Sequence, residues 1–517
     1  MSRKFLLARG VLLGYGALVT QIFYSIASIP LALAYLSKEE FGLWSLITTL
    51  VTYLQLMEFG MTNAFNRHLF ECKDHKEDGR YGRLFLACFV SIGIAALLVL
   101  VIGVILTYAA LPLFKIPVPL REDFTLLMLG SVVITSASLA TRVLVTPLYI
   151  HQRHDLIQLS QIGTYVVLYG VLFFGFHAGW GLYSMLANFA GGFIWGFSYS
   201  VIACIWLKLY PRWGTIKLPD RAEWKSVLHY SVELFAVQIG TQLANSMPML
   251  LIPRLLGLEA AAIWTVCTRP FNILRQVVGK PYEYSLPMLC EMFVKGDLER
   301  MRTRWCHVTQ LVTALAVCIF TVGAANNHDF IRLWVGDKMA WHPSSDWLMG
   351  ALFLVSLLVT SVFGVVGFEK KIGMIRYAPF AEAILVAVNA WWMTRLWGIP
   401  GLVIAAILGQ VLIRLVFGAR YLAEISGGRA SWFVTHSFLR PLCVLPLCAL
   451  AAWGCSHLHG LLPGYEGLLL SASTGTLTSG ALVIFLGVSS DVRSEMTRMF
   501  LKPLARFLPR RFASAGS

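Results

Sequence analysis

Residues 84–110 read LFLACFVSIGIAALLVLVIGVILTYAA and contain no charged side chain. About 20 apolar residues in an α-helix cross the hydrocarbon core of a bilayer, so this stretch predicts a transmembrane helix. The rest of the chain has the same character, because 57% of its 517 residues are hydrophobic, 13% are charged and the mean hydropathy is +0.69. Soluble globular chains carry about 25% charged residues. The sequence therefore predicts a membrane protein that crosses the bilayer many times.

Apolar stretches of similar length, bounded by charged or turn residues, occur along the whole chain. We predict fourteen spans, at 11–33, 42–62, 84–110, 124–149, 158–177, 180–207, 228–251, 258–280, 305–325, 347–367, 375–394, 399–421, 433–455 and 466–488. They leave almost no chain for a soluble domain. The predicted fold class is therefore an all-α polytopic membrane protein with 14 transmembrane helices.

An internal repeat relates the first six predicted spans to the next six. Three pairs of landmarks recur: Ser28–Pro30 with Ser246–Pro248, Trp44 with Trp264, and Gly181–Leu182 with Gly401–Leu402. The offset between partners stays at 218 to 220 residues. Six is an even number, so both halves begin on the same side of the membrane and are related by an axis along the membrane normal. We predict two six-helix lobes related by a pseudo-twofold axis, plus two extra C-terminal helices.

This interpretation divides the chain into five parts. They are an N-terminal lobe at 1–207, a cytoplasmic linker at 208–227, a C-terminal lobe at 228–423, two further spans within 424–490 and a basic tail at 491–517. Lys and Arg residues that flank spans are retained on the cytoplasmic side. With the N-terminus inside, the inner segments hold 29 of the 42 and the outer loops hold seven. Both termini are therefore predicted to be cytoplasmic, and the net charge of +15 indicates topology rather than a nucleic-acid surface.

Three stretches carry a family resemblance. They are YLSKEEFGLWSLITTLVTYLQLMEFGMTNAFNRHL at 35–69, FIRLWVG at 330–336, and the run from KKIGMIRYAPFAEAILVAVNAWW through WGIPGLVIAAILGQVL at 370–412. Their spacing of glycines, aromatic residues and helices resembles that of the Wzx-like polysaccharide and O-antigen flippases. These proteins belong to the multidrug/oligosaccharidyl-lipid/polysaccharide (MOP) exporter superfamily, and the resemblance covers nearly the whole chain.

The resemblance implies a transporter rather than an enzyme. Two lobes around a central cavity would move an undecaprenyl-pyrophosphate-linked oligosaccharide from the cytoplasmic to the outer leaflet of the cell inner membrane by alternating access. The implied partners are this lipid-linked glycan, membrane lipids, a polysaccharide polymerase and the chain-length machinery, with no nucleic acid.

Three alternatives stay open. Fourteen spans also resemble the MurJ-like lipid II flippases, although the cationic pattern of that group's first helix is missing here. Cation-coupled multidrug exporters of the same superfamily resemble one another in a first-helix carboxylate, and residues 11–33 contain none. A polymerase or ligase acting on the same carrier would call for a sizeable outer loop, whereas the largest one predicted, 326–346, is short.

The sequence predicts no cofactor. It contains no G-x-x-x-x-G-K-[ST] loop for ATP and no histidine or cysteine cluster with metal-ligand spacing. Energy for transport is therefore expected from an ion gradient, the membrane potential or downstream consumption of the product.

The eighth predicted span contains three cations and a proline, in LEAAAIWTVCTRPFNILRQVVGKP at 258–281. A charge at the bilayer centre costs about 2.5 to 3.5 kcal/mol, so it normally faces protein or a water-filled cavity. At about 100° per residue, one polar stripe is formed by Arg269, Asn272, Gln276, Lys280 and Glu283. Arg275 lies off that stripe, and Pro270 leaves a backbone carbonyl free, which is tolerable beside a cavity.

The first four residues of the stripe, together with Arg275, are therefore predicted to contact substrate. Arginine offers paired donors to a pyrophosphate. The alternative is structural: Arg269 would pair with Glu233 or Glu382, and the Lys280 side chain would extend to the membrane surface.

Neutral polar groups on other spans complete the predicted site. Gln238, Gln242 and Asn245 share one face of the seventh span, and Tyr24 occupies the position of Gln242 in the first span by the repeat. Such groups suit sugar hydroxyls, although small polar residues also hold membrane helices together. Arg142 and Arg414 are expected near cytoplasmic ends of spans, where a long side chain can reach the interface; Arg142 is the better candidate for binding phosphate.

Overall fold

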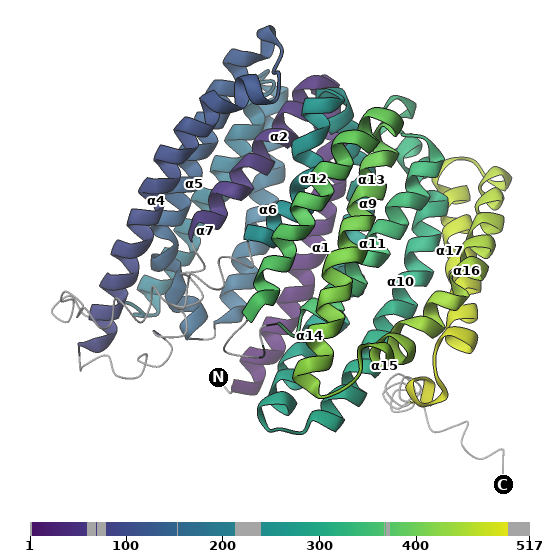
Figure 1. The fold of residues 1–517 in the computed structure, drawn as a ribbon. Helices are drawn as coiled ribbons and strands as arrows, with labels where there is room; N and C mark the ends of the chain where they lie inside the picture. The colour runs from purple at the N-terminus through teal and green to yellow at the C-terminus, as the bar shows by residue number, and fades with distance from the viewer. Residues whose placement is uncertain are drawn as a thin grey trace, which may run out of the picture. The chain divides into compact units, whose positions relative to one another are not determined.

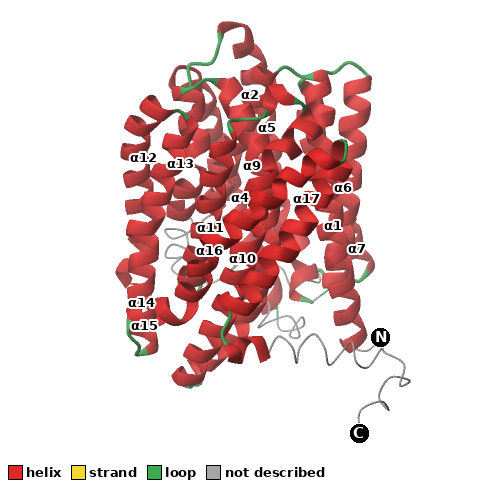
Figure 2. Cartoon of the chain, turned by 90° about the vertical axis from the view of Figure 1, so that its right-hand side faces the viewer, coloured by secondary structure: helices red, strands yellow, loops and turns green. Residues whose placement is uncertain are grey.

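The structure is a computed structural model, and it describes residues 3–58, 69, 79–151, 153–211, 239–366, 368 and 373–494. In this part of the chain all regular structure is helical (Figure 2). Residues 212–227 of the predicted linker at 208–227, the start of the seventh span with Gln238, and most of the basic tail lie outside the described residues.

The chain forms two compact units, and Figure 1 labels the helices that belong to them. Unit 1 comprises Met1–Val266 and Pro379–Ile399, and unit 2 comprises Cys267–Ala378 and Pro400–Ser517. The predicted boundaries at 207, 228 and 423 remain predictions, because these units group residues by contact rather than by repeat.

The helices of unit 1 are α1 (Arg3–Tyr35), α2 (Lys38–Gln55), η1 (Leu56–Glu58), α4 (Arg80–Leu113), η2 (Val118–Leu120), α5 (Arg121–Ile150), α6 (His154–His177), α7 (Tyr183–Trp206), the helical residues 239–255, the start of α9 (Leu258–Val294) and nearly all of α12 (Ala378–Trp397). Within this unit α6 packs against α1 and α7, and α5 packs against α2, α4 and α7. The start of α2 is fixed by a capping box. Ser37 Oγ accepts from the Glu40 amide at 3.2 Å, and the Ser37 amide donates to Glu40 Oε2 at 2.7 Å.

Glycines let the helices of unit 1 approach closely. A Cβ at Gly192 of α7 would lie 2.7 Å from Leu168 Cδ2 of α6, and one at Gly103 of α4 would lie 2.5 Å from Val132 Cγ1 of α5. A Cβ at Gly42 of α2 would overlap the carbonyl oxygen of Leu258 at the start of α9. Small residues at helix contacts are the usual way in which membrane helices pack.

The helices of unit 2 are the rest of α9, α10 (Leu298–Val335), η4 (Asp337–Met339), α11 (Pro343–Phe363), η5 (Gly373–Tyr377), α13 (Ile399–Gly409), η6 (Gln410–Leu415), α14 (Val416–Ser426), α15 (Ala430–Val434), η7 (Thr435–Leu439), α16 (Arg440–Ser456), η8 (His457–Leu461), α17 (Gly464–Leu482) and η9 (Val483–Gly487). Here α10 packs against α11, α16 and α17. Trp305 of α10 is fully buried, donates from Nε1 to the Ser361 carbonyl at 3.2 Å, and meets Phe433 edge to face.

Ten segments in the described part are long and apolar enough to cross a membrane: Leu13–Tyr35, Tyr81–Leu113, Val118–Ile150, His154–His177, Tyr183–Trp206, Leu298–Val335, Pro343–Phe363, Ile399–Ser426, Ala430–Leu461 and Gly464–Gly487. Each overlaps a predicted span. The predicted spans at 42–62, 258–280 and 375–394 overlap the helices α2, α9 and α12, which are not among these ten segments. The chain is thus a multi-pass helical membrane protein.

Two helices extend well beyond the predicted spans. The helices α9 and α10 contain 37 and 38 residues and end at Val294 and Val335, beyond the predicted ends at 280 and 325. Apolar length marks the part of a helix that suits the bilayer. It does not mark the end of the helix, because polar residues such as Glu283 and Glu291 continue the helical backbone hydrogen bonding of α9 beyond the apolar stretch.

Candidate functional site

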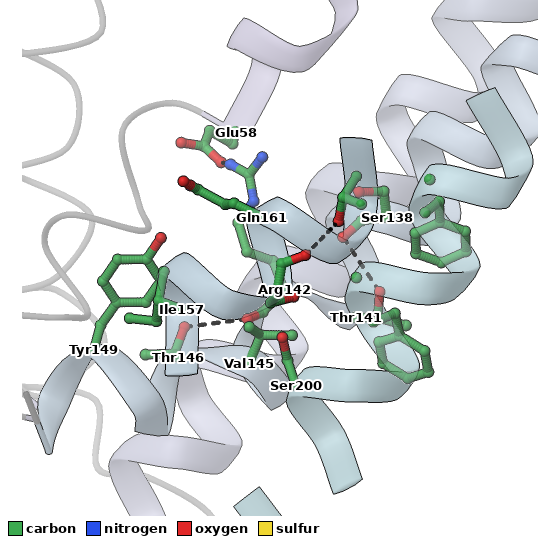
Figure 3. Close-up of a pocket in the computed structure, with 16 residues that line it drawn as sticks. Glu58, Ser138, Thr141, Arg142, Val145, Thr146, Tyr149, Ile157, Gln161 and Ser200 are labelled. Carbon is green, nitrogen blue, oxygen red and sulfur yellow. Dashed lines mark hydrogen bonds and ion pairs between the residues drawn. The ribbon is translucent and has the colours of Figure 1, made fainter. Parts of the chain in front are cut away.

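A cavity of about 580 Å³ lies within unit 1, between α5, α6 and α7 (Figure 3). Its lining residues are Ser138, Thr141, Arg142, Val145, Thr146 and Tyr149 of α5, Ile157, Ser160, Gln161 and Thr164 of α6, Gly192, Phe193, Gly196, Phe197 and Ser200 of α7, and Glu58 of η1. Within each long helix the lining residues recur at steps of mainly three or four, which defines one helix face. Three helices therefore each turn a partly polar face towards one cavity.

Arg142 is the cation of this cavity. Its Nη1 donates to Glu58 Oε2 in an ion pair, and Figure 3 shows the two groups facing each other. The Arg142 side chain is 39% exposed and that of Glu58 is 16% exposed. The guanidinium has further N–H donors beyond the one that this contact uses. An anionic group entering the cavity can therefore bind Arg142 alongside Glu58 or in its place.

Hydroxyl groups line the cavity walls. Thr141 donates to the Ala137 carbonyl at 2.8 Å, Thr146 to that of Arg142 at 3.1 Å, and Thr164 to that of Ser160 at 2.9 Å. Each hydroxyl proton is thus directed to the helix backbone, which leaves the oxygen lone pairs as acceptors. The exposed Gln161 makes no side-chain hydrogen bond within the described residues. The cavity therefore offers many acceptors and a free amide, which is suited to ligands rich in hydroxyl groups.

Two aromatic rings belong to the same wall. Phe193 and Phe197 of α7 are nearly parallel, with centroids 5.9 Å apart and 25° between their planes. Aromatic faces beside hydroxyl acceptors suit the C–H faces and hydroxyl edges of sugar rings.

A hydrophobic cluster adjoins the cavity where α5 turns into α6. It consists of Leu148, Ile157, Ala203, Cys204 and Leu209, and Ile157 also lines the cavity. The turn itself is held by Arg153, which binds both carboxylate oxygens of the buried Asp155 at 3.0 Å. These hydrogen bonds raise the pKa of the Arg153 guanidinium above its ordinary value. Apolar packing and an ion pair therefore hold together the turn beside this part of the cavity.

Tyr24, predicted from the repeat, lies next to this region. Its hydroxyl accepts from Asn188 Nδ2 at 2.8 Å, and its ring lies 5.8 Å from that of Tyr165. Asn188 precedes the lining residue Gly192 by one helical turn, and Tyr165 follows the lining residue Thr164. The buried Oδ1 of Asn188 accepts no hydrogen bond within the described part of the chain. Tyr24 thus belongs to a polar cluster between α1, α6 and α7 that does not line the cavity.

The predicted stripe on α9 is not part of this cavity. The helix runs unbroken through Pro270, with Arg269 and Asn272 half-buried and Gln276 exposed. Lys280 Nζ donates to Glu283 Oε2 at 2.7 Å, so the last two residues of the stripe form an ion pair on one face. Arg275, off the stripe, places its guanidinium 5.5 Å from the Phe353 ring centre in unit 2.

The remaining predicted residues are dispersed. Gln242 donates from Nε2 to Ser246 Oγ at 2.6 Å along its own helix, and Asn245 is exposed. The expectation that the Arg414 side chain reaches the interface was wrong, because Arg414 is only 6% exposed within the π-helical turn η6. A π turn inserts an extra residue per turn and redirects side chains, which a regular helical wheel does not anticipate.

The sequence predicted Arg142 as a site residue but did not predict most of the other residues that line the cavity. The missed polar residues are Glu58, Ser138, Thr141, Thr146, Tyr149, Ser160, Gln161, Thr164 and Ser200. A signal was present, since Ser160, Gln161 and Thr164 form one face of the fifth predicted span, and Gly192, Gly196 and Ser200 recur at steps of four in the sixth. A search for small and polar stripes in uncharged spans would have found these faces.

Residues 6–293 match the family described as "Polysaccharide biosynthesis protein". The chain belongs to this family. The match includes all sixteen lining residues of the cavity. None of the curated proteins matches the chain in sequence.

Solved structures share the fold of this family member. The lipid II flippase MurJ in an inward closed conformation is 11% identical, with a TM-score of 0.64 over 96% of this chain and 99% of that one. An inward-facing MATE family multidrug resistance transporter of the MOP superfamily gives 0.58 at 10% identity, over 78% and 96%. The Vibrio cholerae MATE transporter VcmN gives 0.54 at 14% identity, over 82% and 97%. The chain therefore has the fold of MOP superfamily transporters.

Proposed function

We propose that the protein is a flippase that moves an undecaprenyl-pyrophosphate-linked oligosaccharide from the cytoplasmic to the outer leaflet of the cell inner membrane by alternating access. One observation carries the proposal: a polysaccharide biosynthesis family match spans a cavity that combines an arginine with hydroxyl acceptors and aromatic rings. The fold shared with MOP superfamily transporters supports a transport role.

The substrate class follows from the cavity's chemistry. A pyrophosphate carries about two negative charges, and the Arg142 guanidinium matches its oxygens with paired donors. Threonine and serine oxygens on α5, α6 and α7 accept from sugar hydroxyls. The pair of phenylalanines stacks on sugar faces. In this proposal, recognition involves no making or breaking of covalent bonds.

The proposed architecture keeps fourteen spans, two six-span lobes related by a pseudo-twofold axis, cytoplasmic termini and two extra C-terminal helices. Contacts inside unit 1 support the repeat. The Cβ position of Gly42 lies against the Leu258 carbonyl and 3.4 Å from the Ala262 amide nitrogen, and 262 is 42 plus the repeat offset of 220. A residue that meets its own repeat mate is what a twofold axis produces.

A lipid II-type flippase is the second candidate. The MurJ structure matches 96% of this chain, whereas the two MATE structures described above match 78% and 82%. The additional coverage favours a lipid-linked substrate over a multidrug role. It does not distinguish between the glycans that such a lipid carries.

Reconstitution tests the proposal directly. Purified full-length protein in liposomes should make a labelled undecaprenyl-pyrophosphate-linked oligosaccharide accessible to an impermeant enzyme on the opposite face. Lipid II and a cationic dye are assayed in parallel, and the products are sized. Faster movement of lipid II would favour the second candidate, export of the dye alone would favour a drug exporter, and a lengthened glycan would indicate a polymerase.

Filling the cavity should stop this movement without unfolding the protein. A Cβ at Gly196 meets only Thr164 Oγ1, at 3.5 Å, so Gly196→Leu extends into the cavity without a backbone clash. We expect flipping to fall by about tenfold or more. Gly170→Leu on α6 is the matched control, because its Cβ would meet nothing within 4 Å. Equal flipping by both variants at equal abundance would show that substrate does not pass through this cavity.

Arg269 is proposed to contact the anionic head as well, with Asn272, Gln276 and Lys280 along the same stripe. We expect Arg269→Ala nearly to abolish export and Arg269→Lys to impair it, because lysine keeps the charge and loses the paired geometry. Export is measured by complementation and normalised to membrane-inserted protein. Export that falls only in proportion to protein abundance would assign Arg269 to a structural ion pair instead.

A further inference from the structure

Asp346 is a fully buried carboxylate outside the cavity. It lies in the first turn of α11, in unit 2, with 0% of its surface exposed. Its Oδ1 accepts from Trp341 Nε1 at 2.6 Å and from Asn327 Nδ2 at 2.5 Å. Asn327 Nδ2 also donates to the Cys267 carbonyl at 3.2 Å, which fixes the orientation of its amide. Donors from α10 and from the turn before α11 thus converge on one oxygen.

The other carboxylate oxygen is left without a partner. Oδ2 of Asp346 and Oδ1 of Asn327 are both buried and accept no hydrogen bond from any described residue. Two unsatisfied acceptors in one buried cluster destabilise the folded protein unless a donor is supplied. A proton on Asp346 Oδ2 turns one of these acceptors into a donor.

The charges around Asp346 also favour its neutral form. Within the described residues no basic side chain pairs with it, and the charged neighbour that acts on it is the carboxylate Asp329 of α10. The thiol of Cys267 on α9 is a further titratable neighbour, and its Sγ donates to the Met339 carbonyl at 3.2 Å. His328 of α10 directs its Nδ1 to the Trp341 carbonyl at 3.0 Å rather than to Asp346. An ionised Asp346 would therefore be a buried charge without a counter-ion, which proteins avoid by protonation.

Other features favour the ionised form. Asp346 lies at the N-terminal end of α11, where exposed backbone amides stabilise negative charge. The two donors on Oδ1 stabilise a carboxylate as well. Burial and the negative charge of Asp329 favour the protonated form of Asp346, whereas the helix terminus and the two hydrogen bonds favour the carboxylate. Because these effects oppose each other, Asp346 can both bind and release a proton.

We propose that Asp346 is a proton-binding site, with the proton on Oδ2 while Trp341 and Asn327 hold Oδ1. The proton comes from solvent, and the only bond that forms or breaks is the O–H bond. The described residues contain no group of three or more His, Cys, Asp or Glu side chains that could hold a metal ion, which favours a proton over a divalent cation as the ligand. Through Asn327 and Cys267 the site is linked to α9 two residues before Arg269. The proposal does not depend on the proposed function, because proton binding is measured without transport.

Infrared spectroscopy of the full-length protein in nanodiscs tests this site. A protonated carboxyl group has a C=O band separate from that of a carboxylate. We expect such a band near neutral pH, lost in Asp346→Asn and kept in Asp337→Asn, the control on an exposed carboxylate of the same connection. Identical wild-type and Asp346→Asn spectra from pH 5 to pH 8 would overturn the proposal.

Stability measurements distinguish the loss of proton binding from a failure to fold. Asparagine has the shape and neutrality of the protonated acid, so Asp346→Asn should insert and elute as the wild type does. If it fails to fold, the site requires a charge and the proposal is wrong. The melting temperature of the wild type should fall relative to that of the variant as pH rises, because only the wild type then gains a buried charge. Stabilisation of the wild type by sodium at fixed pH, without the infrared band, would replace the proton by a metal ion and overturn the proposal.

Discussion

Replacing Arg142 by alanine is expected to abolish flipping. The variant removes the cation of the cavity in unit 1, where the pyrophosphate of the proposed substrate would lose its paired donors. Truncating one partner of a buried charge pair costs about 2 to 5 kcal/mol. That corresponds to roughly 30-fold to several thousandfold in binding. The measurement is the initial flipping rate in liposomes, at equal amounts of reconstituted protein.

Glu58 provides the control for this experiment. Arg142→Ala also removes the Arg142 ion pair of the mostly buried Glu58, which lowers stability for a reason unrelated to substrate. The double variant Glu58→Gln with Arg142→Gln removes both charges and should restore abundance but not flipping. Glu58→Gln alone leaves Arg142 available and should keep flipping. Normal flipping by the double variant would show that Arg142 serves only to neutralise Glu58.

Replacing Gly42 by alanine is expected to prevent folding of most of the protein. The added Cβ would overlap the Leu258 carbonyl oxygen and lie 2.8 Å from its carbon. These are backbone atoms, so α2 or the start of α9 must shift rather than a flexible side chain. Overpacking typically costs about 1–3 kcal/mol, and a clash with a backbone oxygen is expected at or above the upper end. The measurement is the fraction of detergent-solubilised protein that elutes as a single species, together with its melting temperature.

Gly93→Ala is the matched substitution on a neighbouring helix. A Cβ at Gly93 of α4 would meet nothing within 4 Å, so alanine gains helix propensity of up to about 1 kcal/mol without a clash. We expect this variant to be as stable as the wild type or more so. If Gly42→Ala were equally well tolerated, the close approach of α2 to Leu258 would not exist in the folded protein.

The length of the apolar stretches was the sequence feature that predicted the helices most reliably. The predicted span at 84–110 lies inside α4, and that at 124–149 lies inside α5. Helical periodicity also placed Lys280 and Glu283 on one face, where they form an ion pair, and Arg275 away from it, over Phe353. These features are local, because they depend on residues within a few turns of one helix.

The cavity could not be derived in the same way. It exists because α5, α6 and α7 turn particular faces to one another, and this depends on close approaches such as that of Gly192 to Leu168. A serine or threonine in an apolar span has the same local appearance whether it faces a cavity, a helix or lipid. Asp346 shows the same difficulty, since its donors come from residues 5 and 19 positions away along the chain. Arg142 was found because a charge in a span is rare enough to be noticed alone.

In the proposed two-lobe architecture, the crossing at Gly42 bears on how the two lobes would have diverged. In a homodimer of a six-span ancestor, a position on the twofold axis meets its own copy and must be the same residue on both sides. If the proposed lobes arose by fusion of two such halves, each side can mutate separately, which accounts for glycine at 42 and alanine at 262. Replacing a residue by its repeat mate is usually a mild substitution in a duplicated sequence. At position 42, where the mate is alanine, this substitution is expected to be among the most damaging.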